Sequence, residues 1–426
     1  MIFKILKKYF LISLITFIIL SYTQQNLYSQ PNNQKKQISS ISNFNNSALK
    51  LFCTTLDYKK NNFCLSPLSI FTSLEMLYHG TQGETANQIA KILWGDTKTP
   101  EITSNFMSQA SFLLNQKTED FTLDIANGLW LQTGFVILPS FINTIEKNFN
   151  GTITYNNFLE DPFTATDNIN LWVAQKTHNK INHLISSEII NYYTRLILIS
   201  AIYFYSKWLI PFNVSNTENR NFYVSQKQVL KVPTMYLDTR NLHATDICYY
   251  EDTQSLALEL PYKNKTLSML IILPTKNTSK DLQQLLTVNY LNTIISKLTV
   301  TKDIYPVIYL PKFTVFTLCN LKELLKKVGI KTIFSPNADF SKMTGNISHP
   351  DNKLYISNAI HKTFIEIQEE STEAAAATAT IIEETAIEYR NPFYISIDKP
   401  FVFIIYEKTS GLILFIGRIT NPIEKN

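Results

Sequence analysis

The side chains that most often carry enzyme chemistry are few in this sequence and stand far apart. Among six histidines, His178 and His183 are five residues apart, which is not the spacing that places two ligands on one helix face. The sequence has no glycine-rich phosphate loop, no HExxH motif and no GxSxG motif. Since no nucleophile, base and orienting group can be combined, we expect no enzymatic activity, no cofactor and no metal ion.

Four cysteines show no metal-ligand spacing, and four cysteines allow three disulfide pairings between which a sequence cannot choose. Cys53 and Cys64 are the nearest pair. Each cysteine stands in an apolar stretch, so small buried free thiols are at least as good an interpretation. The four are Cys53, Cys64, Cys248 and Cys319.

The elements that must position any site form a mainly helical first half and a second half made mostly of strands. Hydrophobic periodicity predicts helices over 47–56, 70–78, 85–94, 140–149, 168–185, 280–296 and 320–329. Strands are predicted over 62–68, where Pro67 ends the strand, and over 121–131, 194–204 and 353–368. The last two apolar runs, 400–406 and 412–419, read as a C-terminal hairpin.

The composition indicates a folded chain and gives no sign of a polyanion partner. Of 426 residues, 45% are hydrophobic and 17% charged, which is too apolar for a disordered protein. The net charge is +5 and the basic residues are scattered, so we expect no binding to nucleic acid.

One stretch fits no ordinary element: residues 369–393 read EESTEAAAATATIIEETAIEYRNPF. Alone, its four consecutive alanines favour an exposed helix or linker. However, one predicted strand enters the stretch and another leaves it, and the small residues over 372–380 would also fit between two closed strands of a sheet. We therefore expect a segment that is a loop in one state and a strand in another.

This stretch and the sequence blocks around it resemble the serpin superfamily, and the resemblance covers about residues 45–422. The resemblance rests on eight blocks in the family order: CLSPLSI (64–70), GETANQIAKIL (83–93), TRLILISAIYFYSKW (194–208), VPTMY (232–236), LPKF (310–313), FSPNADFSKMTG (334–345), NAIHKTFIEIQEESTEAAAATA (358–379) and ISIDKPFVFII (395–405).

The resemblance implies an α+β fold with about nine helices around three β-sheets, in one domain over 46–426. An exposed reactive-centre loop would lie over about 369–392. It also implies a protease inhibitor that acts as a suicide substrate: the protease cleaves the loop, an acyl-enzyme forms, and the freed hinge inserts into the central sheet. The nucleophile then belongs to the target serine protease, and the inhibitor is expected to be a monomer.

The resemblance assigns the hinge residue by residue. Glu369 begins the hinge, and Thr372 is the first side chain that must turn into the sheet. Ser371 stands where the family usually has glycine, so insertion is expected to be slower without being abolished. The predicted hinge consists of Glu369, Glu370, Ser371, Thr372, Glu373, Ala374, Ala375, Ala376, Ala377 and Thr378, in which the side chains from Thr372 onward alternate inward and outward and all inward ones are small.

Further positions match the family's shutter below the central sheet and its breach, where insertion begins. The shutter residues are Ser66, Ser69 and His361, and the breach residue is Trp208. Ser200 stands where most relatives carry an asparagine that bonds the shutter histidine, so we expect an altered network. Lys312 and Glu369 match a pair that holds the hinge out of the sheet, and an exposed pair of this kind contributes only about 0–1 kcal/mol.

The family alignment places the reactive bond at Thr385-Ala386, within about two residues. Small residues there fit a protease with a small apolar pocket, such as an elastase-like enzyme, and Arg390 as the reactive residue would instead indicate a trypsin-like target. The segment that matches the family's heparin site, 101–115, has no Lys or Arg, so activation by sulfated polysaccharide is not expected.

Two other functions stay open: a non-inhibitory serpin with a carrier, chaperone or storage role, and an inhibitor of cysteine proteases. Bulky, charged or proline-bearing hinges mark the non-inhibitory type, and the side chains of this hinge that are predicted to turn inward have none of these features.

The N-terminus predicts export. Residues 1–23 combine a basic start with an uncharged apolar run, as signal peptides do, and 24–45 form a polar extension. The mature protein is therefore expected to be secreted and extracellular, with no membrane association after signal removal. Six N-glycosylation sequons suit this location: Asn45, Asn150, Asn213, Asn264, Asn277 and Asn346.

Overall fold

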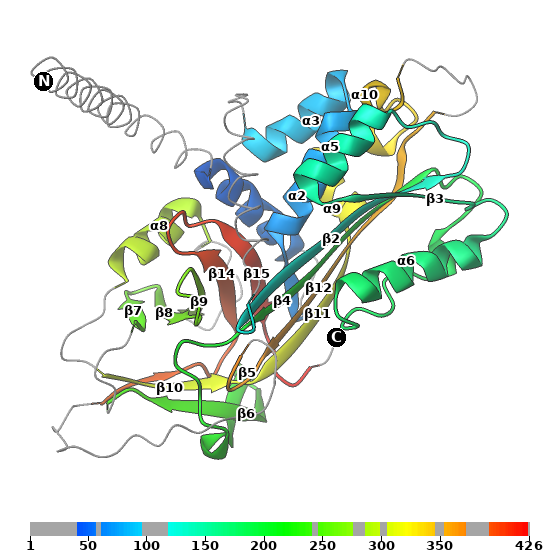
Figure 1. Cartoon of the computed structure of the whole chain (residues 1–426). Coiled ribbons are helices and arrows are strands. Elements are labelled where there is room, and N and C mark those ends of the chain that lie inside the picture. The colour runs from blue at the N-terminus through cyan, green and yellow to red at the C-terminus, as the bar shows by residue number, and fades with distance from the viewer. Residues whose placement is uncertain are drawn as a thin grey trace, which may run out of the picture.

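The computed structural model describes residues 41–56, 61–95, 118–240, 246–275, 286–298, 305–345, 353–371 and 392–424 (Figure 1). The first described element is a helix over 41–56. Ile41 and Phe44 on this helix are buried, with 3% and 4% of their surface exposed. The packed part of the chain therefore includes residues before position 46, where the sequence placed the start of the domain, because these two side chains add apolar surface to the core.

The central sheet has five strands in the order β11-β12-β4-β2-β3. It is built from β2 (Phe121–Gln132), β3 (Thr152–Asn156), β4 (Leu196–Ser206), β11 (Phe313–Asn320) and β12 (Ile356–Ile367). β12 lies antiparallel to β11 and parallel to β4, although β4 and β12 are far apart in the sequence. The long run of apolar residues in β4 is buried on both faces, as the sequence predicted.

Two further sheets complete the fold, so the predicted α+β fold with three sheets is confirmed. A six-stranded sheet has the order β1-β15-β14-β9-β8-β7, from β1 (Phe63–Leu65), β7 (Cys248–Glu251), β8 (Ser255–Pro261), β9 (Leu267–Pro274), β14 (Phe401–Glu407) and β15 (Ile413–Ile419). β14 and β15 form the predicted C-terminal hairpin. A four-stranded sheet has the order β13-β10-β6-β5, from β5 (Glu218–Ser225), β6 (Gln228–Asp238), β10 (Tyr305–Pro311) and β13 (Pro392–Ser396).

Prolines begin three of the helices, because the first helical position needs no backbone N–H. α2 (Pro67–Gly80), α5 (Pro139–Phe149) and α6 (Pro162–Lys176) all start this way. The expected strand over 62–68 was too long: β1 ends at Leu65, Ser66 caps α2, and Pro67 starts a helix rather than ending a strand. The other labelled helices are α3 (Gly83–Trp94), α8 (Val288–Lys297), α9 (Leu321–Val328) and α10 (Ser341–Thr344).

α6 also differs from the helix expected over 168–185. Asp161 caps its start by accepting a hydrogen bond from the Thr164 backbone N–H at 3.0 Å. The helix ends before Thr177, because His178 and Asn179 adopt positive φ angles of 51° and 61° that no helix tolerates. The residues after α6 therefore form an irregular segment against the central sheet.

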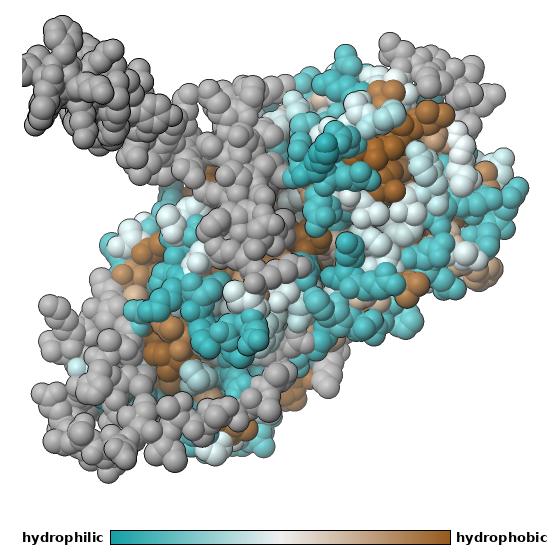
Figure 2. All heavy atoms as spheres, in the orientation of Figure 1, coloured by the Kyte–Doolittle hydropathy of each residue, from teal (hydrophilic) through white to brown (hydrophobic). Residues whose placement is uncertain are grey.

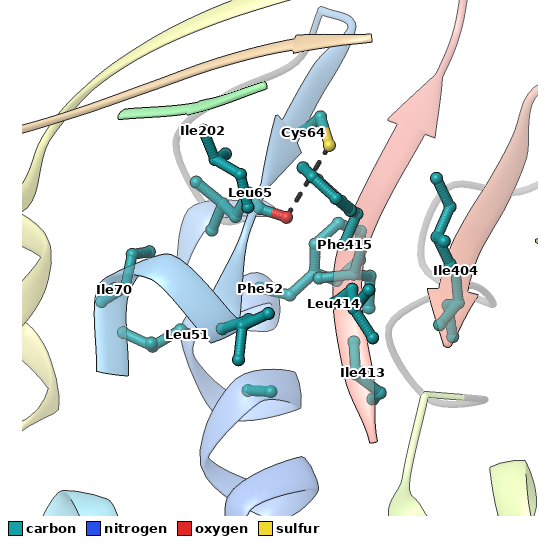
Figure 3. Packing of buried hydrophobic residues seen from close by; sticks show 14 of the residues in the cluster. Leu51, Phe52, Cys64, Leu65, Ile70, Ile202, Ile404, Ile413, Leu414 and Phe415 are labelled. Carbon is teal, nitrogen blue, oxygen red and sulfur yellow. Dashed lines mark hydrogen bonds between the residues drawn. The ribbon is translucent and has the colours of Figure 1, made fainter. Parts of the chain in front are cut away.

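The buried hydrophobic residues form two cores. The larger core joins the helix over 41–56, α2, the central sheet and the six-stranded sheet, and Figure 3 shows Leu51, Phe52, Ile70 and Phe415 meeting there. The smaller core lies between α6, with the segment after it, and the outer face of the central sheet (Figure 1). Three of its members are alanines: Ala126, Ala165 and Ala201. α6 is thus attached to the sheet through a separate and smaller apolar contact.

Large hydrophobic side chains are exposed at several separate places on the described surface. Figure 2 shows hydrophobic residues in separate patches among hydrophilic ones on one side of the molecule. The large exposed hydrophobic side chains come from different elements, such as Phe163 on α6 and Tyr394 on β13. Within the described ranges, no helix has both the length and the apolar character needed to cross a bilayer.

All four cysteines are free thiols, which confirms the interpretation as free thiols over any disulfide pairing. Cys64 and Cys319 are buried, and Cys53 and Cys248 are half-buried. Burial raises the pKa of the Cys248 thiol to about 11, so this thiol stays protonated at neutral pH.

The sequons differ in accessibility. Asn45 is wrongly predicted as a glycosylation site in this fold: it is buried, and its side chain bonds Gly411 O at 2.8 Å and Ile413 N at 3.2 Å. Asn264 is half-exposed, with its amide nitrogen turned away from solvent, and stays a prediction. Asn150 and Asn213 are exposed and stay candidates. Asn277 and Asn346 lie outside the described residues.

An unpaired carboxyl group lies inside α2. Glu75 is fully buried, and neither of its side-chain oxygens has a hydrogen-bond partner. Burial raises the pKa of Glu75 to about 8. Between pH 4.5 and 8 the folded protein therefore binds a proton at this site that the unfolded chain does not, and stability falls as the pH rises through that window.

We expect Glu75→Met to increase the free energy of unfolding by about 1–3 kcal/mol at pH 7, because it removes an unsatisfied buried polar group. It should also remove about 3 kcal/mol of the loss in stability between pH 5 and pH 8. Chemical denaturation at pH 5, 7 and 8 measures both effects. Glu146→Met, at an exposed glutamate on α5, is the control and should change neither. An unchanged pH profile for Glu75→Met would contradict the assignment.

Candidate functional site

The candidate site is the boundary between β4 and β12, which we call the seam. Its register runs from Leu196 opposite Ile356 to Tyr203 opposite Phe364. Beyond this last pair, β4 continues to Ser206 and β12 to Ile367 without pairing to each other. The two strands are parallel, so a third strand running the opposite way could pair with both of them. The seam is therefore open at one end, and the chain that leaves β12 begins there.

A buried histidine lies midway along the seam, as the resemblance predicted for the shutter. His361 on β12 stands opposite Ser200 on β4. The backbone N–H of Ser66 donates to His361 Nε2 at 3.1 Å, so the ring proton is on Nδ1, which faces Ser200 O at 3.0 Å and Ser200 Oγ at 3.1 Å. Burial lowers the pKa of His361 to about 3, although the bond to the Ser200 carbonyl acts in the opposite direction. The ring is therefore neutral at neutral pH.

The shutter network includes a residue that the sequence analysis missed. Asn127 on β2, opposite Ser200 in the register, accepts from Ser69 Oγ at 3.1 Å and donates to Ser69 O at 3.1 Å. Ser69 Oγ is also 2.8 Å from Ser200 Oγ. With serine at position 200, the network still connects α2, β2, β4 and β12. A polar residue in the apolar strand over 121–131 was the available signal for Asn127.

The start of the predicted hinge is held by backbone hydrogen bonds at the open end of the seam. We call Gln368, Glu369, Glu370 and Ser371 the hinge clamp, because each of their carbonyl groups accepts a bond. The donors are Trp208 Nε1 to Gln368 O at 2.8 Å, Phe212 N to Glu369 O at 2.8 Å, Trp208 N to Glu370 O at 3.0 Å and Gln368 N to Ser371 O at 3.0 Å. Trp208 stacks on Tyr262 with 4.7 Å between ring centroids, so the predicted breach residue is itself rigidly placed.

The Lys312–Glu369 pair predicted by the resemblance is present and is more buried than expected. Lys312 Nζ lies 2.8 Å from Glu369 Oε2, and Thr217 Oγ1 donates to Glu369 Oε1 at 2.8 Å. The Glu369 side chain is only 6% exposed. Burial alone would raise the pKa of Glu369, but the bonds from Lys312 and Thr217 reverse this and hold the pKa below its ordinary value. Removal of Lys312 alone should therefore cost more than the range for exposed pairs, because it would leave a buried carboxylate without its cation.

The segment over 177–186, which we call the strap, crosses the outer face of the seam. His178 Nε2 is 2.8 Å from Asp124 Oδ2 on β2, and its ring lies 4.8 Å from that of Tyr203. Lys180 Nζ lies 5.6 Å from the centre of the Phe364 ring. Since Tyr203 and Phe364 are the last pair of the seam, the strap covers the point where a new strand would enter. His178 is exposed to solvent, and its ring also contacts Tyr203 of this pair.

Other predicted site residues lie outside the described residues. These are the hinge from Thr372 to Thr378, the reactive bond Thr385-Ala386 and the segment 101–115. Among the described residues, no group of three or more His, Cys, Asp and Glu could hold a metal ion.

We expect Lys312→Met to loosen the hinge clamp, because it leaves the buried Glu369 carboxylate with Thr217 as its side-chain partner. A loss of about 1.4 kcal/mol would increase amide exchange at Trp208 and Phe212, the clamp donors, about tenfold. Hydrogen exchange with mass spectrometry measures this. Lys326→Met, which breaks the exposed Lys326–Glu323 pair on α9, is the matched control and should leave both amides protected. Unchanged exchange in Lys312→Met would show that the pair does not secure the clamp.

Comparisons with known proteins agree with this geometry. A family model described as "Serpin (serine protease inhibitor)" matches residues 42–422. The leukocyte elastase inhibitor of Bos taurus is 33% identical over 382 residues, which cover 88% of this chain and 97% of that relative.

Solved structures extend the similarity to three dimensions. Serpin48 of the insect Tenebrio molitor, described as a highly specific serpin, has a TM-score of 0.77 at 31% identity and covers 91% of this chain and 98% of its own. Human thyroxine-binding globulin, solved with thyroxine, has a TM-score of 0.79 at 27% identity and covers 91% of this chain and 100% of its own.

Proposed function

Because this chain belongs to the serpin family, we propose that it is a secreted inhibitor of serine proteases that acts as a suicide substrate. The observation that carries this proposal is the seam: β4 and β12 are parallel neighbours, and the chain leaving β12 starts at their open end. A hinge that turns back there would run antiparallel to both strands. Insertion would thus replace one parallel ladder by two antiparallel ladders, which are slightly more stable per residue.

The proposed reaction uses the nucleophile of the protease. Its serine attacks the carbonyl carbon of Thr385, the bond from that carbon to the nitrogen of Ala386 breaks, and the new amine leaves with the proton from the serine hydroxyl. The ester that remains links the protease to the chain that ends at Thr385. Hinge insertion must then precede attack by water, because hydrolysis of the ester would release a cleaved inhibitor and an active protease.

The inhibitor's own residues set the barrier to insertion. The hinge clamp must open at Glu369, the strap must leave Tyr203 and Phe364, and His361 must separate from Ser200 for a strand to pass between β4 and β12. The inward hinge residues are threonine and alanine, which fit a closely packed sheet interior. This combination supports inhibition over a role as carrier, chaperone or storage protein.

The proposed target is an elastase-like serine protease. Thr385 and Ala386 are small and fit a small apolar specificity pocket. The name of the leukocyte elastase inhibitor, a relative at 33% identity, points to the same class of protease. A trypsin-like enzyme that cuts after Arg390 is the second candidate, and a cysteine protease is the third.

The test is to incubate the protein with pancreatic elastase, trypsin and papain and to search for a complex that resists SDS. We expect a complex with elastase, and mass spectrometry of the released C-terminal peptide should place the cut at Thr385-Ala386, within two residues. A single cut after Arg390 would move the target to the trypsin-like class. Cleavage by all three enzymes without a complex would overturn the inhibitor proposal in favour of the non-inhibitory alternative.

Secretion forms a separate part of the proposal and rests on residues 1–23. Expression of the full chain in a cell with an export pathway should release a protein that lacks these residues. N-terminal sequencing of the released protein checks this, and a chain retained with Met1 would contradict it.

A further inference from the structure

One end of the central sheet carries exposed hydrophobic side chains next to charges of both signs. At this end β2 and β3 finish, β4 starts and α6 begins, whereas the hinge clamp lies at the other end of β4. Single exposed hydrophobic residues are normal, but four of them on two neighbouring segments indicate an interaction site. We call this set the end surface: Leu159 (41% exposed), Glu160, Phe163 (72%), Tyr192 (69%), Tyr193 (68%) and Arg195.

Two segments that are far apart in the chain meet here. They are residues 157–163, which lead from β3 into α6, and residues 191–195, which lead into β4. Gln132, the last residue of β2, bonds both of them: its backbone N–H donates to Arg195 O at 2.9 Å, and its Nε2 donates to Asn157 Oδ1 at 3.3 Å. The exposed side chains of the two segments therefore belong to one surface.

The turn before β4 holds its two tyrosines in a fixed position. Asn191 Oδ1 accepts a hydrogen bond from Tyr193 N at 2.9 Å, and the Tyr355 hydroxyl donates to Tyr193 O at 2.9 Å. Arg195 Nη1 donates to Tyr192 O at 2.8 Å. The ring centroids of Tyr192 and Tyr193 are 5.5 Å apart. A turn fixed in this way loses little conformational entropy when a partner binds, and tyrosine is common among the residues that dominate protein–protein binding.

The charged side chains of the end surface have no partner of opposite charge among the described residues. The Arg195 guanidinium donates to two backbone carbonyls, Tyr192 O at 2.8 Å and Thr194 O at 3.2 Å, which leaves its positive charge uncompensated. The Glu160 carboxylate accepts from the Asn157 amide at 2.7 Å, which leaves its negative charge uncompensated. A purely acidic or purely basic partner would match one of these charges and oppose the other. A surface with both charges matches a second copy of itself.

We propose that the end surface joins two copies of this chain in a symmetric dimer. A two-fold axis brings the same surface of both copies together, so that Arg195 of each copy faces Glu160 of the other. Arginine and a carboxylate form strong paired hydrogen bonds in this arrangement. The exposed Phe163 and tyrosine rings then cover each other around the two ion pairs. A dimer takes the place of the monomer that the resemblance implied.

The proposed dimer leaves both hinge clamps accessible. The end surface and the hinge clamp are separated by β4, whose 11 residues span about 35 Å. Each copy can therefore meet a protease while the dimer persists. The inference goes beyond the proposed inhibitory function and does not depend on it, because the contact needs no protease.

Charge reversal tests the proposed contact, with the molecular mass measured by sedimentation equilibrium from micromolar to submillimolar concentration. We expect the parent protein to approach twice the monomer mass as its concentration rises, and to dissociate at high salt, which screens the ion pairs. Glu160→Arg and Arg195→Glu should each weaken dimerisation about tenfold or more, because each places like charges opposite one another. Tyr193→Ser should weaken it too, since it removes apolar contact area.

A mixture of the two reversed variants should dimerise again. When a Glu160→Arg copy meets an Arg195→Glu copy, opposite charges face each other at both contacts, so the mixture should reach the parental mass although each variant alone stays mainly monomeric. Tyr394→Ser is the matched control, because Tyr394 is 61% exposed but lies on β13, in another sheet. It should dimerise like the parent. Melting temperatures near that of the parent show that the variants are folded.

A parent protein that stays monomeric over the whole concentration range would overturn the dimer. A dimer that neither charge reversal weakens would overturn the end surface as its interface, and a mixture that stays monomeric would overturn the pairing of Glu160 with Arg195. None of these measurements uses a protease, so they separate the dimer from the inhibitory function. The absence of an SDS-resistant complex would contradict the inhibitor proposal and leave the dimer standing.

Discussion

Cleavage of the loop between residues 380 and 392 should raise the melting temperature of this protein by about 10 °C or more. A cut in an exposed loop ordinarily destabilises a fold or leaves it unchanged. Here the freed residues 372–380 can enter the seam between β4 and β12, whose pairing already stops at Tyr203 and Phe364. About nine added backbone hydrogen bonds at roughly 1 kcal/mol each would shift the melting temperature of a chain of this size by about that amount.

Calorimetry before and after limited cleavage measures the shift, and mass spectrometry locates the cut. Protein treated with the inactivated protease serves as the control and should melt as before. The cleaved form should also show slower amide exchange along β4 and β12, since both strands would gain a new partner. A melting temperature that stays the same or falls after a mapped cut in this interval would remove the insertion mechanism.

Thr372→Arg should convert the inhibitor into a plain substrate. Thr372 follows Ser371, a fully buried residue of the hinge clamp, and is the first side chain predicted to enter the sheet. An unpaired guanidinium there would add several kcal/mol of desolvation to the barrier, and about 3 kcal/mol already slows insertion more than a hundredfold. Hydrolysis of the acyl-enzyme would then win. The free energy of unfolding of the intact protein should change by less than about 0.5 kcal/mol, because residue 372 is predicted to enter the sheet only after cleavage.

The measurement pairs gel analysis of the complex with the rate of loop cleavage. The complex with elastase should disappear from the gel while the loop is still cut at the same bond. Glu373→Arg is the matched control, because it places the same side chain at the next position, which is predicted to face outward, and it should still trap the protease. A Thr372→Arg variant that traps its protease at near-parental stoichiometry would show that the first inward residue lies elsewhere.

The residues themselves determined the family, the mixed α+β class and the main members of the site. The sequence alone identified these members, because each belongs to a contiguous block whose residue types are distinctive. They are Ser66, Ser69, His361, Trp208 and the Lys312–Glu369 pair. The C-terminal hairpin and the apolar strand β4 were predictable for a related reason: burial on one or both faces leaves a local pattern of apolar residues.

The tertiary structure alone decided which distant segments act on each other. The hinge clamp consists of backbone carbonyls, and a backbone carbonyl looks the same in every sequence. Asn127 enters the shutter only because β2 and β4 pair in one register, and His178 reaches the seam only because α6 ends at Lys176 and the strap crosses the sheet.

The same reason explains the wrong prediction at Asn45, whose sequon is a local signal. Its burial comes from the docking of its helix against the β14–β15 hairpin, more than 360 residues away in the chain. Residue types and local periodicity thus predict which segments are strands and which side chains are reactive or small. The pairing of segments that are far apart in the chain decides which residues each strand and side chain contacts. The energy of that pairing depends on both segments together, so neither local sequence predicts it alone.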